Sequence, residues 1–307
     1  MFIIRHKYIF LACSGIMVLA SIAAIAFFGF TLGIEFTGGS LLEVEYTEMR
    51  PSVEEARAAI ADITLEGLVI QPSGAQGLLL RFKNIDEATH QEIISRLAAA
   101  SREHREMREL RFDSIGATIG RELRNRSILA LALAGAFIVL YITWAFRHVS
   151  RPVSSWKYGV AAVLALGHDV LIPTGVFAVL GYWYGVEIDS LFITALLTIM
   201  GFSVHDTIVV FDRTRENLRK TKSAEPYAKV VGMSVRETFG RSVATSCTVM
   251  LVLVAIFLFG GDSTIYFALA LIIGIGVGTY SSIFVASPIL VVWHELLERR
   301  RRIRDCC

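Results

Sequence analysis

The sequence has 307 residues, a formal net charge of +2 and a hydrophobic fraction of 54%, with 19% charged residues. Its mean hydropathy of +0.57 is too high for a water-soluble domain with that many charges, unless the apolar residues are concentrated in blocks. The composition therefore excludes an ordinary water-soluble enzyme or binding domain and predicts a membrane protein.

Six apolar runs are long enough to cross the hydrocarbon core of a bilayer, which takes about 20 helical residues. They cover residues 8–28, 128–146, 158–182, 188–211, 243–259 and 265–293. Each run must be a helix, because backbone polar groups in lipid need partners within their own segment. The fold class predicted is a polytopic α-helical membrane protein.

The charges between the spans predict the orientation of the chain. Basic residues precede the first span, fill the connections after the second and fourth spans, and follow the last span; examples are Arg5, Arg147, Arg151, Lys157, Arg213, Lys222 and Arg299. The alternate short connections carry only acids, Glu187 and Asp262. The positive-inside rule then places both termini in the cytoplasm. Since every basic cluster borders a span, topology explains the arginines, and no nucleic-acid partner is expected.

The first span is expected to be an uncleaved anchor, because its apolar run exceeds a signal-peptide core and no small-residue cleavage site follows. We divide the chain into a cytoplasmic N-terminus with the first span (1–30), an outer domain (31–126), the remaining spans (127–295) and a basic tail (296–307). A cytoplasmic loop is expected at 212–237.

The outer segment predicts a small α+β domain. Alternating and apolar patterns indicate strands at 40–47, 67–72, 77–82 and 107–116, and amphipathic patterns indicate helices at 51–63 and 85–103. The order β-α-β-β-α-β is the ferredoxin-like arrangement. Such a sheet leaves one face or one edge free for a polypeptide. A role as a spacer alone also stays open.

A first polar group inside a span is Asp169, in the stretch GHDVLIP with His168 before it. Asp169 lies about twelve residues past Lys157, near mid-membrane at ~1.5 Å per residue. Pro173 cannot donate a hydrogen bond to the Asp169 carbonyl, so a helix kink is expected there. Asp169 and His168 are therefore candidates for a proton relay, or Asp169 is a structural group bonded to a neighbouring helix.

The fourth span contains Asp206, preceded by His205 and six residues before Asp212, hence about 9 Å inside the cytoplasmic boundary. Arg241, at the start of the fifth span, lies at a similar depth and is expected to pair with Asp206. Nearby arginine favours the charged carboxylate, and moving it away favours protonation, which predicts a switchable proton site. Two alternatives stay open: Asp206 reaches cytoplasmic water, and Arg241 pairs with Glu237, four residues before it.

The last span carries Gly274 and Gly278, a small-xxx-small face for close helix packing, with Gly276 between them. Signals for an enzyme are absent: the chain has no HExxH, GxSxG or P-loop motif. Its four cysteines have neither metal-binding spacing nor a disulfide framework. No enzymatic activity, cofactor or metal site is expected.

Several stretches, in order along the whole chain, resemble the SecF proteins of the SecD/SecF family, within the RND superfamily. They are GIEFTGGS, SIGATIGREL, GHDVLIPTGVF, GFSVHDTIVVFDRTREN and FGGDSTIYFALALIIGIGVGTYSSIFVASPI. The resemblance implies a six-helix RND-type bundle with a ferredoxin-like periplasmic domain, in the bacterial cytoplasmic (inner) membrane. It implies SecD, the SecYEG channel, SecA and a preprotein as partners, and the proton as coupling ion in late steps of preprotein translocation.

By the same resemblance, the essential membrane aspartate of the family matches Asp206, and the arginine in the next span matches Arg241. The family loop D-F-T-G-G matches Glu35, Phe36, Thr37, Gly38 and Gly39. The chain has Glu35 where the family usually has aspartate, and His205 where it usually has asparagine. The alternative functions are half of an RND-type exporter of a lipid or small molecule, and a membrane enzyme or structural scaffold.

Overall fold

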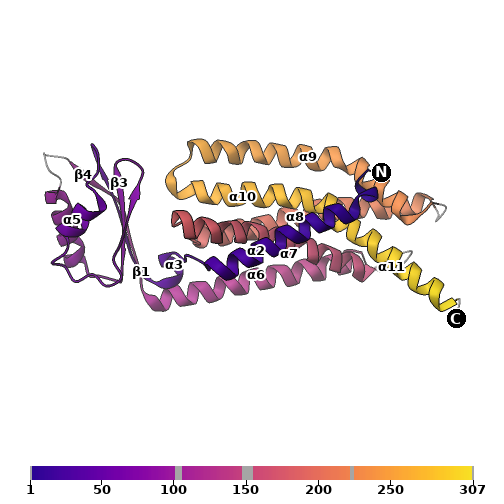
Figure 1. The fold of residues 1–307 in the computed structure, drawn as a ribbon, viewed down its shortest axis with the longest axis horizontal. Coiled ribbons are helices and arrows are strands. Elements are labelled where there is room, and N and C mark those ends of the chain that lie inside the picture. The colour runs from indigo at the N-terminus through magenta and orange to yellow at the C-terminus, as the bar shows by residue number, and fades with distance from the viewer. Residues whose placement is uncertain (1, 101–105, 147–154, 222–224, 306–307) are drawn as a thin grey trace. The chain divides into compact units, whose positions relative to one another are not determined.

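The computed structural model of the chain describes residues 2–100, 106–146, 155–221 and 225–305 (Figure 1). It contains two compact units: Leu32–Ile128, and a helical unit formed by the residues on either side. Of the residues discussed above, Arg147, Arg151 and Lys222 lie outside the described residues, as do the two C-terminal cysteines.

The outer unit has the predicted order of strands and helices. Its elements are α3 (Ile34–Thr37), β1 (Gly39–Tyr46), α4 (Val53–Ala59), β2 (Val69–Ser73), β3 (Gly77–Phe82), α5 (Glu87–Ala100) and β4 (Met107–Ile115). The sheet is antiparallel with strand order β2-β3-β1-β4, which makes β2 and β4 its edges. The predicted ferredoxin-like domain is thus confirmed.

Alternation along β1 explains where the core of this domain lies. Leu42, Val44 and Tyr46 are fully buried on one face of the strand, under α4 and α5. Leu42 lies opposite Leu80 on β3 and Phe112 on β4, so one apolar row crosses the sheet. Helix α4 begins with a capping box, in which Ser52 Oγ accepts from the backbone N–H of Glu55 at 3.1 Å and the Glu55 carboxylate accepts from the Ser52 N–H at 2.9 Å.

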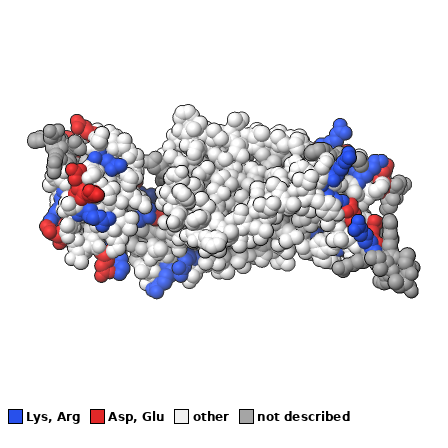
Figure 2. Space-filling view, in the orientation of Figure 1, with Lys and Arg blue, Asp and Glu red and all other residues white. Residues whose placement is uncertain are grey.

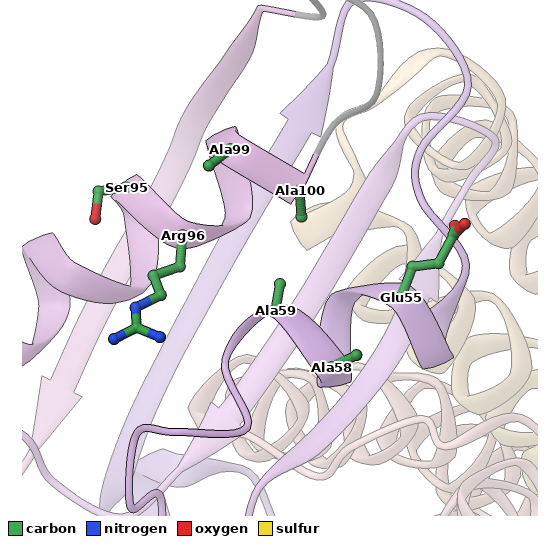
Figure 3. Close-up of a pocket in the computed structure, with 7 residues that line it drawn as sticks. All are labelled: Glu55, Ala58, Ala59, Ser95, Arg96, Ala99 and Ala100. Carbon is green, nitrogen blue, oxygen red and sulfur yellow. The ribbon is translucent and has the colours of Figure 1, made fainter.

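A hollow of about 650 Å³ lies between α4 and α5 (Figure 3). Its walls are the alanines 58, 59, 99 and 100, with Glu55 and Arg96 among the residues that line it. Arg96 is held by Asp62 and Glu92 at 3.1 and 2.7 Å. The hollow therefore offers a ligand little beyond small apolar side chains.

The helical unit contains the six predicted spans. They are α2 (Lys7–Phe28), α6 (Ala117–Ala145, whose first turns belong to the outer unit), α7 (Ser155–Tyr184), α8 (Ser190–Thr221), α9 (Tyr227–Phe259) and a last span, Thr264–Arg299, that begins in α10 (Asp262–Ser281). Helix α1 (Phe2–Arg5) precedes the first span. A π-helical turn, Ser282–Ala286, joins α10 to α11 (Ser287–Asp305). The prediction of a polytopic helical membrane protein is confirmed.

The segment expected as a loop at 212–237 is instead mostly helical. Helix α8 continues to Thr221 and α9 begins at Tyr227. Ion pairs at helical spacing stabilise the extensions, among them Arg215 with Asp212 and Lys220 with Glu216 at 2.6 and 2.7 Å. The charged composition that indicated a loop therefore forms solvated helical turns.

The bundle has a central and a peripheral set of helices. Helices α7, α8 and α10 have many buried residues, whereas α2, α6 and α9 have few. Small residues allow the close approach that helix packing in lipid requires: a Cβ added to Gly175 would lie 2.5 Å from Ser21 Cβ. Figure 2 shows a broad uncharged zone over the visible face of the bundle, with charged side chains at one end.

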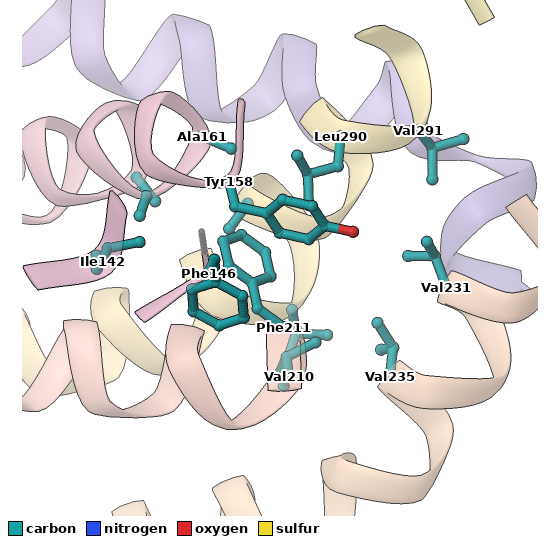
Figure 4. Close-up of a cluster of buried hydrophobic side chains, with 14 of the residues drawn as sticks. Ile142, Phe146, Tyr158, Ala161, Val210, Phe211, Val231, Val235, Leu290 and Val291 are labelled. Carbon is teal, nitrogen blue, oxygen red and sulfur yellow. The ribbon is translucent and has the colours of Figure 1, made fainter. Parts of the chain in front are cut away.

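Near that charged end, residues of α6, α7, α8, α9 and α11 share one apolar cluster (Figure 4). Phe146, Tyr158 and Phe211 pack edge to face or stacked, with ring centroids 5.2 to 6.1 Å apart. The Tyr158 hydroxyl lies 3.3 Å from the Tyr227 hydroxyl, which joins α7 to the start of α9. The cluster fixes the helix ends next to the polar groups described below.

Candidate functional site

Asp206 lies at the contact between α8 and α9, where only 3% of the residue is exposed. Ser242 of α9 faces it and is equally buried. Among the described residues, neither Asp206 Oδ2 nor Ser242 Oγ has a hydrogen-bond partner. This α8–α9 seam, defined by Asp206 and Ser242, therefore contains polar atoms with unused hydrogen-bonding capacity.

His205 and Arg241 lie beside the seam but on the exposed surface of their helices. Both act electrostatically on Asp206, yet no ion pair within 4.0 Å joins Arg241 to Asp206 in the described part of the chain. The expected direct pair is thus not formed. Consecutive helical side chains project about 100° apart, so the helix rotation that buries Asp206 and Ser242 turns His205 and Arg241 outward.

The expected alternative partner of Arg241 is engaged elsewhere. Glu237 accepts hydrogen bonds from Arg213 at 2.6 Å and from the Asn217 amide at 2.8 Å, both on α8. These contacts form a polar layer between α8 and α9, one turn from Arg241 along α9. Arg241 makes no ion pair with any described residue.

A row of hydroxyl residues on α9 was not identified from the sequence. Ser234, Thr238, Ser242 and Ser246 are spaced four residues apart, and all four are buried on one face of α9. Ser234 Oγ accepts from the Asn217 amide at 3.0 Å, and Ser246 Oγ lies 2.6 Å from Thr279 Oγ1 of α10. The four-residue spacing was the signal that could have identified this hydroxyl stripe.

Asp169 occupies a separate buried cluster formed by α7, α8 and α10, and it is completely inaccessible to solvent. His168 Nδ1 lies 2.9 Å from Asp169 Oδ1, and Ser281 Oγ donates to Oδ2 at 2.6 Å. Ser203 Oγ also donates to Oδ2. Ser203 and Ser281 could not be assigned from sequence because they lie on other helices. Helix α7 continues through Pro173 without interruption.

The loop 35–39 lies at the start of the outer unit, with Phe36 buried and Gly38 and Gly39 at φ +77° and +130°. A Cβ on Gly38 would lie 2.6 Å from Ala117 Cα, and a Cβ on Gly120 would lie 2.8 Å from the Gly38 nitrogen. The loop thus packs backbone to backbone against the first turn of α6. Glu35 and Thr37 flank the buried Phe36, and the Thr37 hydroxyl donates to Gly33 O at 3.1 Å.

The glycines of the last span face different neighbours. A Cβ on Gly274 would lie 2.1 Å from Ile199 Cδ1, and one on Gly278 would lie 3.2 Å from Ser203 Cβ, both on α8. Gly276 has only Met250 Cε near its Cβ position, at 3.8 Å. Gly274 and Gly278 therefore lie at the α8–α10 contact, and Gly276 does not.

Comparison with known proteins relates these features to one family. The family model described as "Protein export membrane protein SecD/SecF, C-terminal" matches residues 96–296, and "SecD/SecF GG Motif" matches residues 23–48. The "Protein translocase subunit SecF" of Thermobaculum terrenum is 43% identical over 303 residues, which are 95% of this chain and 94% of the relative.

The chain belongs to the SecD/SecF family.

A second member, the "Protein translocase subunit SecF" of Anaerolinea thermophila, is 40% identical over 95% of this chain and 94% of its own length. The crystal structure of SecDF from Thermus thermophilus, described as a translocon-associated membrane protein, has a TM-score of 0.82 and 32% identity. It covers 95% of this chain, which spans 38% of that longer SecDF chain. Within the SecD/SecF family models, the GG match contains Glu35–Gly39, and the C-terminal match contains Asp169, Asp206 and Arg241.

Proposed function

We propose that this chain is the accessory SecF-type subunit of a Sec protein translocase in the bacterial cytoplasmic membrane, with both termini in the cytoplasm. It works with a SecD-type partner, the SecYEG channel and SecA on a preprotein. The proton-motive force drives late steps of translocation through proton exchange at Asp206. Membership of the SecD/SecF family and the naming of its relatives as translocase subunits support the role in export.

The observation that carries the proton step is the α8–α9 seam. A buried carboxylate oxygen without a hydrogen-bond partner is costly in lipid unless it exchanges a proton or gains a partner. Arg241 and His205 lie beside the seam on the exposed sides of their helices. A small rotation of α8 or α9 therefore changes the electrostatic field at Asp206. The seam is therefore a place where helix movement and protonation are coupled.

Asp206→Asn tests the proposal, because it keeps the size of the side chain and removes the titrating group. We expect the variant to insert and to bind its partner, while late export no longer responds to the proton gradient. The measurement is completion of translocation of a stalled preprotein in inverted vesicles, with and without a protonophore. Ser242→Ala, which removes no titrating group, is the matched control and should retain the gradient response. A full gradient response in Asp206→Asn would refute the proton step.

A further inference from the structure

The second His-Asp dipeptide, His168–Asp169, forms a site that the exchange at Asp206 does not use. The Asp169 carboxylate is completely buried among three helices, and all its hydrogen-bond donors are neutral hydroxyls or the His168 ring. No lysine or arginine in the described part of the chain forms an ion pair with it. A single buried carboxylate charge in a membrane bundle requires such donors or a neutralising proton.

His168 is only 4% exposed, and its Nε2 atom has no hydrogen-bond partner among the described residues. An ionised Asp169 carboxylate can only accept, so Nδ1 at 2.9 Å then donates to it and the lone pair of the neutral ring lies on Nε2. A buried acceptor without a donor is an unfavourable arrangement. A proton on Nε2 converts the ring into an imidazolium directly beside the carboxylate, so the pair as a whole becomes neutral.

We propose that His168 and Asp169 form a proton-binding site inside the helix bundle, in which His168 Nε2 accepts one proton and Asp169 stabilises the imidazolium. In this step one N–H bond forms at Nε2, and one O–H bond of a hydronium ion breaks to leave a water molecule. Ser203 of α8 and Ser281 of α10 are positioning residues that hold Asp169 toward the ring. Ser281 directly precedes the π-helical turn, so the site lies where α10 leaves its regular helical register.

Few other titratable groups face the pair. Helix α10 contributes Tyr280, whose ring is 6.2 Å from the His168 ring and whose hydroxyl lies 3.2 Å from Ser14 Oγ of α2. On α8, Asp206 lies three residues beyond Ser203, but it faces Ser242 of α9. Lys7 of α2 and Glu295 of α11 form an ion pair with each other. The π-helical turn, SIFVA, has no ionisable side chain.

The packing favours a proton over a metal cation. Ser203 and Ser281 already contact Asp169 Oδ2, and a Cβ on Gly278 would lie 3.7 Å from that oxygen. The hydroxyls donate to the carboxylate, so their lone pairs are not presented together to a central ion. A sodium ion would need these contacts to be broken first.

Nitrogen-15 NMR of histidine-labelled full-length protein in lipid nanodiscs tests the proposal directly. His168→Gln assigns the His168 signals by their loss. As the pH of the sample is lowered from about 8 to about 5, we expect the Nε2 signal of His168 to change from the unprotonated to the protonated form. In Asp169→Asn the ring should stay neutral over that range, and Asp169→Glu, which keeps the charge, should restore the titration.

The His205→Gln variant is the matched control from the other His-Asp dipeptide and should leave the His168 titration unchanged. A His168 ring that stays neutral in the wild type, or that titrates identically in Asp169→Asn, overturns the proposal. A shift of the His168 signals on adding sodium chloride at constant pH, but not potassium chloride, also overturns it in favour of a sodium site. None of these readouts measures export, so they stand or fall independently of the proton step at Asp206.

Discussion

At the scale of single residues, the two His-Asp dipeptides show how helix rotation assigns different roles to the same pair of side chains. On α8, Asp206 is buried and His205 is exposed, so the histidine is available to a partner or to lipid headgroups. On the more enclosed α7, both His168 and Asp169 are buried and contact each other. The rotation of α8 is fixed by contacts such as Ile199 against Gly274, which lie two turns away.

Tyr46 provides a residue-scale prediction in the outer domain. Its hydroxyl donates to Leu97 O at 3.4 Å, and burial raises the pKa of Tyr46 to about 12. Because the pKa in the folded domain exceeds the unfolded value of about 10, the stability linked to this group is complete below pH 10 and is lost as the pH rises through 12. The free energy of unfolding of the wild-type domain should therefore fall by about 3 kcal/mol over this pH range, at 1.36 kcal/mol per pKa unit. We expect no such fall in Tyr46→Phe, which has no hydroxyl to titrate.

The measurement is urea unfolding of the separate outer domain, which has its own apolar core, at several pH values. At pH 7 the two proteins should differ by about 1 kcal/mol at most, the value of one hydrogen bond. Burial lowers the pKa of Arg81 to about 10, which acts with the opposite sign in the same window. Arg81 is present in both proteins, so its contribution cancels when the wild type is compared with Tyr46→Phe. Parallel dependences of the free energy of unfolding on pH in the two proteins would contradict the prediction.

At the scale of elements, the packing of the 35–39 loop against α6 predicts unequal effects for two glycine substitutions. Gly38 and Gly67 both have positive φ, +77° and +71°, which costs a substituted alanine about 1–2 kcal/mol. Only Gly38 also lacks space, because its Cβ would meet the Ala117 backbone, whereas nothing lies within 4 Å of a Cβ on Gly67. Gly38→Ala should therefore destabilise the loop by clearly more than Gly67→Ala does.

Hydrogen exchange of the full-length protein checks this prediction. Gly38→Ala should increase exchange at the Gly38 N–H, which donates to Ile34 O at 2.8 Å, and in the first turn of α6. Gly67→Ala should leave both regions protected as in the wild type. Equal exchange in the two variants would show that the contact with Ala117 relaxes without effect.

The elements also show what the sequence could and could not predict. Hydropathy and alternation predicted six spans and the β-α-β-β-α-β domain, because these patterns report which residues leave water, either for lipid or for a protein core. They did not predict that α8 continues as a charged helix to Thr221, or that α9 begins as a charged helix at Tyr227. Charged helical turns resemble loops in composition. Nor could they predict that Ser203 and Ser281 hold Asp169, because contacts between helices depend on rotation and register. The π-helical turn in GTYSSIFVAS could not be predicted either, because its residues are as apolar as those of a regular membrane helix.

At the scale of the whole molecule, the exposed charges of α9 indicate a surface that another membrane protein covers. Helices α2, α6 and α9 are the peripheral spans, and Arg241 is exposed on α9 without an ion-pair partner among the described residues. An arginine facing lipid costs up to about 3 kcal/mol at the centre of a bilayer. A partner that supplies a carboxylate or a hydrated path removes that cost, so Arg241 favours the complex over the single chain.

Arg241→Leu should therefore have effects of opposite sign on the chain alone and on the complex. Without a partner, the variant should unfold at a higher temperature than the wild type in nanodiscs, because the exposed charge is gone. With a coexpressed SecD-type partner, less of the complex should copurify, because the partner loses its counter-charge. Arg219→Leu, at an exposed arginine ten residues or more beyond the seam on α8, should change neither quantity. If Arg241→Leu lowered the unfolding temperature of the chain alone, Arg241 would act within this chain, and the inferred partner surface would have to lie elsewhere on the peripheral helices.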